Sequence, residues 1–174
     1  LVIGGTGHTG RSLVRQLADE GQDAVVVSSG RTAVDKEAFP ANVEFVTLSY
    51  GQMLPDGSFE ALLARQRPDA VVDILQADAV GVCSACRRAG VRHLVFCGSL
   101  WMLGRPKMVP TPEVRQTESP FEFYKTRYAQ LLEVLRQSGE GGVAVSAVMP
   151  PNICGPGKVP LEGRGGRSIE VHRE

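Results

Sequence analysis

Apolar residues occur along this chain in two patterns that alternate from its first residue to about residue 148. Short runs that are almost entirely apolar predict buried strands, whereas longer stretches with apolar residues three or four apart predict helices that bury one face. The expected strands are residues 1–3, 24–27, 43–48, 70–75, 91–97 and 143–148. The expected helices are residues 8–20, 59–66, 77–89 and 120–138. Strand and helix therefore alternate through most of the chain.

This alternation is typical of an α/β fold, in which the strands form a parallel sheet and helices cover both of its faces. The strands are nearly continuous apolar runs, as expected when neither face meets water. We therefore predict a doubly wound, mostly parallel sheet of at least six strands in three layers, α/β/α. Residues 1–150 are expected to form this domain, and residues 151–174 a remnant of a substrate-binding region or an irregular tail.

A Pro-rich segment, residues 104–119, separates the fifth expected strand from the long last helix. In a doubly wound sheet, the loops that follow the carboxyl ends of the strands form the ligand site. The segment is longer than most connections in compact domains. Its length and place favour a role facing the substrate over a role as a linker.

Composition and charge narrow the class of partner. The hydrophobic fraction of 43% and charged fraction of 22% are ordinary for a soluble globular domain. Nineteen basic and 19 acidic residues give a formal net charge of zero, which indicates neither a nucleic acid nor an anionic membrane as partner. No apolar run reaches membrane-spanning length and no signal peptide precedes the first strand, so we expect a cytoplasmic protein.

The four cysteines do not form a disulfide framework of the kind found in small secreted domains. We expect reduced thiols. Cys83 and Cys86 have the spacing of some redox and metal sites, but they lie in the middle of an expected helix without a second ligand pair. Packing is therefore the favoured role for both, and no metal site is predicted.

A glycine-rich turn follows the first strand and opens the first helix. It reads Gly4-Gly5-Thr6-Gly7-His8-Thr9-Gly10. Glycines at these positions allow a tight turn and a close approach of the backbone to a pyrophosphate, which the amino end of the helix then attracts. The strand before the turn and the helix after it strengthen this interpretation. We predict a dinucleotide-binding turn; a glycine-rich turn without a ligand is the alternative.

The end of the second strand discriminates between NAD and NADP. An acid at this position binds the ribose 2′-hydroxyl of NAD, but no acid is present after Val27. Arg31 has the geometry to meet a 2′-phosphate with two hydrogen bonds, and Ser29 adds a hydroxyl. NADP is therefore favoured over NAD, with a solvated loop arginine as the alternative. Leu75, at the end of the fourth strand, is expected in the same cofactor site.

The chain resembles the short-chain dehydrogenase/reductase superfamily in its extended branch, the NAD-dependent epimerases and dehydratases. The resemblance covers nearly the whole chain. The segments that carry it are the glycine-rich turn, Phe96-Cys97-Gly98-Ser99 followed by Leu103-Gly104, Tyr124 at the start of the long helix, and Met149-Pro150-Pro151-Asn152-Ile153-Cys154-Gly155-Pro156-Gly157. The last is similar to Arg-Pro-x-Asn-x-Tyr-Gly-Pro-Gly in that branch.

The resemblance implies that Tyr124 is the catalytic acid or base and that Ser99 holds the same substrate oxygen. A phenol is a poor base at neutral pH unless a nearby positive charge stabilises its phenolate. In the family, a lysine one helical turn after the tyrosine supplies that charge. Here Tyr128 occupies that position. Lys125 and Arg127 are the nearest cations, and we expect neither to be well placed on an ideal helix.

Other positions also depart from the family pattern. Ser49 stands where the branch often has an adenine-contacting Asp, Met149 replaces the usual Arg and Cys154 the usual Tyr. Simpler structural roles remain open for three of the candidates. Ser99 has the chemistry of a strand-end cap, Tyr124 that of an amphipathic aromatic on a helix, and His8 that of a solvated loop residue.

The predicted function is that of an NAD(P)-dependent oxidoreductase or epimerase/dehydratase-like enzyme. It acts on a carbonyl or hydroxyl of a small molecule, free or nucleotide-linked. Two alternatives remain: a sensor or partner-binding module that binds NAD(P) without catalysis, and a truncated, inactive fragment. The resemblance also implies a homodimer packed through the helix at residues 120–138.

Overall fold

Six strands form one all-parallel sheet in a computed structural model of the chain, which describes residues 1–31 and 33–153. The strand order is β3-β2-β1-β4-β5-β6, so the chain reverses its direction across the sheet between β1 and β4. The strands are β1 (Val2–Ile3), β2 (Ala24–Ser28), β3 (Val43–Thr47), β4 (Ala70–Asp73), β5 (His93–Cys97) and β6 (Ala144–Val148). The predicted doubly wound parallel sheet is confirmed.

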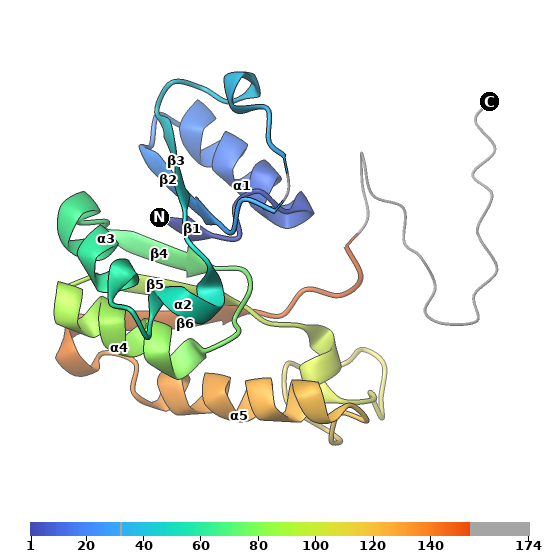
Figure 1. Cartoon of the computed structure of the whole chain (residues 1–174). Coiled ribbons are helices and arrows are strands. Elements are labelled where there is room, and N and C mark those ends of the chain that lie inside the picture. Colours follow the sequence, from blue (N-terminus) through green and yellow to red (C-terminus); the bar gives the residue numbers. More distant parts are fainter. Residues whose placement is uncertain (32, 154–174) are drawn as a thin grey trace, which may run out of the picture.

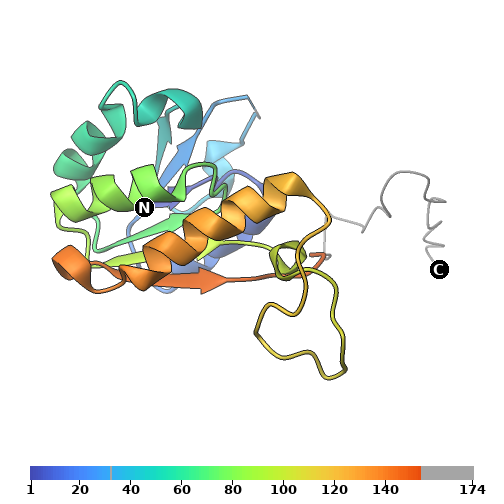
Figure 2. The same ribbon diagram turned by 90° about the horizontal axis from the view of Figure 1, so that it is seen from below.

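Helices cover both faces of the sheet, as Figures 1 and 2 show. Helix α1 (His8–Asp19) lies on one face, and α3 (Ser58–Gln66), α4 (Ala79–Ala89) and α5 (Glu122–Arg136) lie on the other. A single turn, α2 (Tyr50–Met53), follows β3. Three short 3₁₀ segments complete the elements: η1 (Lys36–Ala38), η2 (Leu100–Leu103) and η3 (Glu140–Gly142). The structure therefore has the three expected layers.

The sheet separates two hydrophobic clusters. Neighbouring residues of a strand point to opposite faces; Val2 belongs to the cluster under α1, and Ile3 to the larger cluster under α3, α4 and α5. Cys83 and Cys86 on α4 are fully buried in the larger cluster, and burial raises the pKa of both thiols. The prediction that these two cysteines pack in the core is confirmed.

Strand β4 ends two residues earlier than its apolar pattern predicts. The Asp73 carboxylate accepts hydrogen bonds from the backbone N–H groups of Leu75 (3.0 Å) and Gln76 (2.9 Å), which draws the chain out of the sheet. The next helix also begins later than expected. The Asp78 carboxylate caps it by accepting from the Gly81 N–H at 2.9 Å. Two acids therefore set the boundaries that hydrophobicity alone misplaces.

The segment at residues 104–119 forms a loop that projects from the body of the domain beside the start of α5 (Figure 2). Its two ends meet at Thr117. The Thr117 hydroxyl donates to the Arg105 carbonyl at 3.0 Å and accepts from the Arg105 N–H at 2.7 Å. Gly104 has φ +75°, and a Cβ there would collide with Thr117, so only glycine fits the base of the loop.

Residues 154–174 lie outside the described part of the chain, so the expectations for Cys154 and for most of the 151–174 region stay predictions. Within residues 1–31 and 33–153, no helix combines the length and the apolar character that crossing a bilayer requires. No group of three or more His, Cys, Asp or Glu side chains is arranged to hold a metal ion in those same residues.

Candidate functional site

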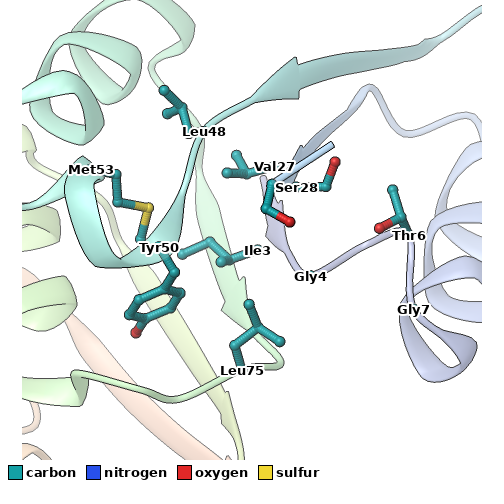
Figure 3. A pocket seen from close by; sticks show the side chains of 11 residues that line it. Ile3, Gly4, Thr6, Gly7, Val27, Ser28, Leu48, Tyr50, Met53 and Leu75 are labelled. Atoms are coloured by element: carbon teal, nitrogen blue, oxygen red, sulfur yellow. The ribbon is translucent and has the colours of Figure 1, made fainter. Parts of the chain in front are cut away.

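A pocket opens at the carboxyl edge of the sheet, where the strand order reverses between β1 and β4. Figure 3 shows the side chains that converge on it from β1, β2 and α2 and from the turns that follow β1, β3 and β4. It encloses about 180 Å³. We call it the switch-point pocket; its lining residues are Ile3, Gly4, Thr6, Gly7, Val27, Ser28, Ser29, Leu48, Tyr50, Met53 and Leu75. Ligands of doubly wound sheets bind at this reversal point.

The glycine-rich turn forms one wall of the switch-point pocket and leaves no room for side chains beneath it. Gly4 has φ +83°, a conformation that favours glycine, and a Cβ there would lie 3.1 Å from the Leu75 side chain. A Cβ on Gly10 would lie 2.6 Å from the Gly5 Cα and would collide with the Gly4 carbonyl oxygen. The turn is therefore folded tightly on itself, with Gly5 and Gly10 buried below it.

Helix α1 points its amino end into this turn. Its cap residue, Gly7, offers no side-chain oxygen, and no acid lies in the first turn. By helix geometry, the N–H groups of His8, Thr9 and Gly10 have no carbonyl partner within the helix, and the helix dipole adds positive potential there. Such an end fits a pyrophosphate. Arg11 adds a cation close by, because its Nε donates to the Thr6 carbonyl at 2.9 Å.

The end of β2 forms the next part of the pocket wall, beside Gly4, whose N–H donates to the Val27 carbonyl at 2.8 Å. Ser28 and Ser29 line the pocket, and Ser29 is exposed. Gly30 then turns the chain with φ +73° against Thr47 of β3. Arg31 follows as an exposed residue just beyond the lining. Of the two residues predicted for this wall, Ser29 therefore lines the pocket and Arg31 lies next to it in the chain.

Tyr50, which lines the pocket, is hydrogen-bonded to the buried Asp73, and the sequence alone did not predict this polar pair. The Tyr50 hydroxyl donates to Asp73 Oδ2 at 2.7 Å and accepts from the Asp78 N–H at 3.1 Å. Asp73 is fully buried at the carboxyl end of β4. Burial and the nearby carboxylate raise the pKa of Tyr50, so this phenol remains protonated. The pair fixes the Tyr50 ring against the pocket. The signal for this pair in the sequence is an acid, Asp73, within the apolar run of the fourth strand.

Asp73 makes the stability of the domain depend on pH. Burial raises the pKa of its carboxyl, although hydrogen bonds from Tyr50, Gln76 and Leu75 and the charge of Arg127 oppose the shift. The folded state therefore binds this proton more tightly than the unfolded state. The resulting stability is complete below the unfolded pKa of about 3.9 and is lost as pH rises through the folded pKa.

We expect the free energy of unfolding of the wild type, measured relative to Asp73→Asn, to fall as pH rises above about 4. Asparagine has similar size but does not titrate, so it serves as the reference. Urea unfolding of both proteins at several pH values between 4 and 7 measures this difference. A difference that is constant or that grows with pH contradicts the assigned shift.

A second hollow lies at the ends of β5 and β6. We call it the β5–β6 groove; it encloses about 200 Å³ and is lined by Leu100, Trp101, Gly104, Pro151 and Asn152. Ser99 precedes the lining residue Leu100 in the chain; it is half-buried, and its hydroxyl accepts from the Trp101 N–H at 3.3 Å. Ser99 therefore caps η2, the structural role left open above, and this role leaves the hydroxyl's proton free to donate.

Tyr124 lies near this groove in the first turn of α5, and an aromatic cluster connects the two. The Trp101 and Phe121 rings pack edge to face with centroids 5.6 Å apart, and the Phe121 and Tyr124 rings do so at 6.1 Å. Helix α5 also packs against η2, which Ser99 caps. The fold thus gathers Ser99 and Tyr124 at one end of the sheet.

The two cations that follow Tyr124 turn in opposite directions. Lys125 turns outward to ion pairs with Glu122 (3.2 Å) and Glu118 (3.6 Å). Arg127 turns inward, and its Nε donates to the Gln76 carbonyl at 2.8 Å. Lys125 is therefore turned away from the interior, as expected, and Arg127 is bound to the loop after β4.

The family of the chain is decided by a match over most of its length. A family described as NAD(P)H-binding matches residues 4–150, from the glycine-rich turn to just beyond β6. The chain belongs to this NAD(P)H-binding family. The resemblance to the extended short-chain dehydrogenase/reductases, in the epimerase and dehydratase branch, is confirmed.

Two curated proteins illustrate how far the similarity of this NAD(P)H-binding chain extends. UDP-glucose 4-epimerase of Azospirillum brasilense is 29% identical over 158 residues, which cover 80% of this chain and 44% of the epimerase. 2′-Dehydrokanamycin reductase of Streptomyces kanamyceticus is 34% identical over 116 residues, which cover 65% of this chain and 31% of the reductase. The chain thus spans less than half the length of these relatives.

Solved structures share the fold of the NAD(P)H-binding chain. UDP-glucose 4-epimerase of Thermotoga maritima with UDP-glucose has a TM-score of 0.68 at 20% identity, covering 85% of this chain and 53% of that one. The Bordetella bronchiseptica enzyme WbmG in complex with NAD and UDP has a TM-score of 0.66 at 22% identity, covering 85% and 51%. Both therefore support the doubly wound architecture.

Proposed function

We propose that this chain is the cofactor-binding part of an NAD(P)-dependent oxidoreductase or epimerase-like enzyme that acts on a carbonyl or hydroxyl of a small molecule. The observation that carries the proposal is the turn from Gly4 to Gly10, whose tight backbone and free helix N–H groups fit a pyrophosphate. Thr6, His8 and Thr9 lie on the same turn and complete this part of the cofactor site. Leu75, which packs beside Gly4 and also lines the pocket, contributes an apolar contact.

Ser99 and Tyr124 are the residues we assign to the chemistry. When bound, the nicotinamide supplies a carbon that accepts or donates a hydride. In oxidation, the Tyr124 oxygen as phenolate takes the proton from the substrate hydroxyl, and in reduction the Tyr124 hydroxyl returns it. The Ser99 hydroxyl donates a hydrogen bond to the same substrate oxygen. Trp101 in the β5–β6 groove offers an aromatic surface beside the reacting group.

The substrate class that the relatives favour is a nucleotide-linked sugar, since two of the proteins above are UDP-glucose 4-epimerases. The test uses the intact protein with UDP-glucose and with a panel of small aldehydes and ketones, following NAD(P)H absorbance and epimer formation. Turnover that depends on the cofactor supports the proposal. Tight cofactor binding without turnover on any of these probes favours the non-catalytic alternative, for which Tyr128 at the lysine position argues.

NADP is the cofactor we propose, on the basis of Arg31 and Ser29. We expect Arg31→Ala to weaken NADPH binding about tenfold and to leave NADH binding unchanged, because an exposed charge-assisted pair to the 2′-phosphate contributes about 1.5 kcal/mol. Parallel fluorescence titrations of both nucleotides measure the two affinities. Arg65→Ala is the matched control, since Arg65 is an exposed arginine in the last turn of α3, paired with Glu44. Equal losses for NADPH and NADH contradict the assignment.

Oligomeric state and location complete the proposal. We propose a homodimer that packs through residues 120–138, where Leu132 of α5 is exposed, and sedimentation of the intact protein tests it. The reduced, buried thiols of α4 are compatible with the cytoplasm, where we place the protein.

A further inference from the structure

Trp101 is an exposed aromatic side chain that the fold holds at a fixed place in the β5–β6 groove. It lies in η2 and lines the groove beside Leu100; Trp101 is 45% exposed and Leu100 is 43% exposed. Large apolar side chains that stay exposed and line a hollow are typical of ligand-binding sites. The groove therefore offers an apolar surface to a ligand.

Three contacts hold η2, and Trp101 with it, in position. Met102, the next residue, is fully buried in the larger core cluster. The Leu100 N–H donates to the Pro150 carbonyl at 3.1 Å, which connects η2 to the segment after β6. The Phe121 ring packs edge to face with the Trp101 ring, with centroids 5.6 Å apart. The aromatic surface is therefore preorganised, and a ligand that binds there orders few side chains.

The described lining of the groove is mostly apolar. It contains one polar side chain, the amide of Asn152, whereas Leu100, Trp101 and Pro151 are apolar and Gly104 has no side chain. A sugar ring carries several hydroxyl groups, and each hydroxyl that is buried without a partner costs free energy. A ring with apolar faces and a single oxygen avoids this cost. The described lining therefore fits an apolar ring better than a sugar.

The oxygen of such a ligand has a partner directly beside Trp101. Ser99 Oγ accepts from the Trp101 N–H at 3.3 Å, and the Ser99 hydroxyl keeps its own proton for a second hydrogen bond. A ligand oxygen that accepts this proton lies next to η2. A ring joined to the carbon that carries this oxygen then lies beside the groove wall that Trp101 forms.

We propose that the substrate of this chain carries an apolar ring, aromatic or alicyclic, next to its reacting alcohol or carbonyl group, and that Trp101 selects this ring. The inference rests on the function proposed above. It names a different substrate class from the nucleotide-linked sugar that the relatives favour. Trp101 acts as a specificity-determining residue, because its ring contacts the substrate and takes no part in proton transfer.

The first experiment uses Trp101 as its own probe. It is the only tryptophan of the chain, so tryptophan emission reports directly on the groove. The chain is titrated, without cofactor, with benzyl alcohol, cyclohexanol and UDP-glucose, and the signal of Trp101→Phe is subtracted. We expect a saturable change of emission with a ring alcohol and none with UDP-glucose. A response to benzyl alcohol alone assigns an aromatic ring, and a response to cyclohexanol alone assigns an alicyclic ring.

The second experiment measures NADP-dependent oxidation of the ring alcohol that binds. We expect Trp101→Leu to lower kcat/KM about tenfold, mainly through a higher KM, because an aromatic contact with the substrate is lost. Trp101→Phe keeps an aromatic ring and should lose about threefold at most. Val80→Ala is the control and should leave both constants unchanged, since Val80 is an exposed apolar residue on α4 outside the groove lining.

The outcomes separate this inference from the proposed function. A change of emission with UDP-glucose, or no change with either ring alcohol, overturns the inference. An equal KM in Trp101→Leu and the wild type also overturns it, while turnover with NADP leaves the proposed function supported. A ring alcohol that changes the emission of Trp101 but is not turned over instead contradicts the proposed function and leaves the groove's preference for an apolar ring supported.

Discussion

Replacing Gly10 by alanine is expected to destabilise the domain and abolish cofactor binding. The added Cβ would lie 2.6 Å from the Gly5 Cα and 2.8 Å from its carbonyl carbon, and would collide with the Gly4 carbonyl oxygen. These are backbone atoms, which cannot rotate away, so the whole turn must shift. Overpacking of this kind costs about 3 kcal/mol. For a chain of this length we expect the thermal midpoint to fall by roughly 6–12 °C.

The control for this substitution is Gly51→Ala. Gly51 lies within the helical turn α2, has an ordinary φ, and has no atom within 4 Å of the position that a Cβ would take. Alanine favours helix over glycine, so its thermal midpoint should stay the same or rise slightly. Thermal unfolding with and without NADPH measures both effects, because a ligand of the native state raises the midpoint. A Gly10→Ala protein that NADPH stabilises as well as the wild type would falsify the assignment of the turn.

Removing one oxygen, in Tyr124→Phe, is expected to reduce kcat of the intact protein by about 100-fold or more while cofactor affinity stays unchanged. Proton transfer by a positioned side chain contributes roughly 10²–10⁴ in rate. The phenyl ring keeps its edge-to-face packing against Phe121 and Phe123, so the fold is preserved. Steady-state kinetics of hydride transfer, together with a cofactor titration, separate the two quantities.

Tyr128→Phe is the matched control for Tyr124→Phe. Both tyrosines are half-buried on α5 and pack against the larger core cluster. The Tyr128 ring is covered by Arg115, so its hydroxyl has no assigned part in the chemistry. We expect its kcat to lie within about twofold of the wild type. Equal losses in the two variants would show that helix packing, and not proton transfer, explains the effect.

The fold could be predicted because its signals are local in sequence. Each strand coincides with a run of apolar residues in the sequence. Val2 and Ile3 belong to different clusters because successive side chains of a strand point to opposite faces of the sheet. The errors also have local causes. Ile74 and Leu75 continue the apolar run, but the Asp73 side chain takes the backbone N–H group of Leu75 and ends the strand. The helical turn α2 was not predicted, because its four residues are too few to show the hydrophobic periodicity of a helix.

The candidate site also has parts that the sequence predicts and parts that it does not. The glycine-rich turn lies within ten residues of the chain, so its conformation could be predicted from the local sequence alone. The Tyr50–Asp73 hydrogen bond joins residues 23 apart, and the Gln76–Arg127 pair joins residues 51 apart. No periodicity indicates which distant polar residues will meet inside a fold. The inward direction of Arg127 therefore depends on the packing of α5 beside the loop after β4, which the sequence does not specify.

The closed base of the 104–119 loop has a consequence for how this domain can diversify. Gly104 and Thr117 join the two ends, so the tip does not have to hold β5 and α5 in position. The tip carries exposed apolar side chains at Met108, Val109 and Val114. Doubling the length of a flexible loop costs only about 0.6 kcal/mol of closure entropy. Insertions and substitutions at the tip can therefore change the surface that the loop presents to a ligand or partner. They cost little stability, because the hydrogen-bonded base of the loop is unaffected.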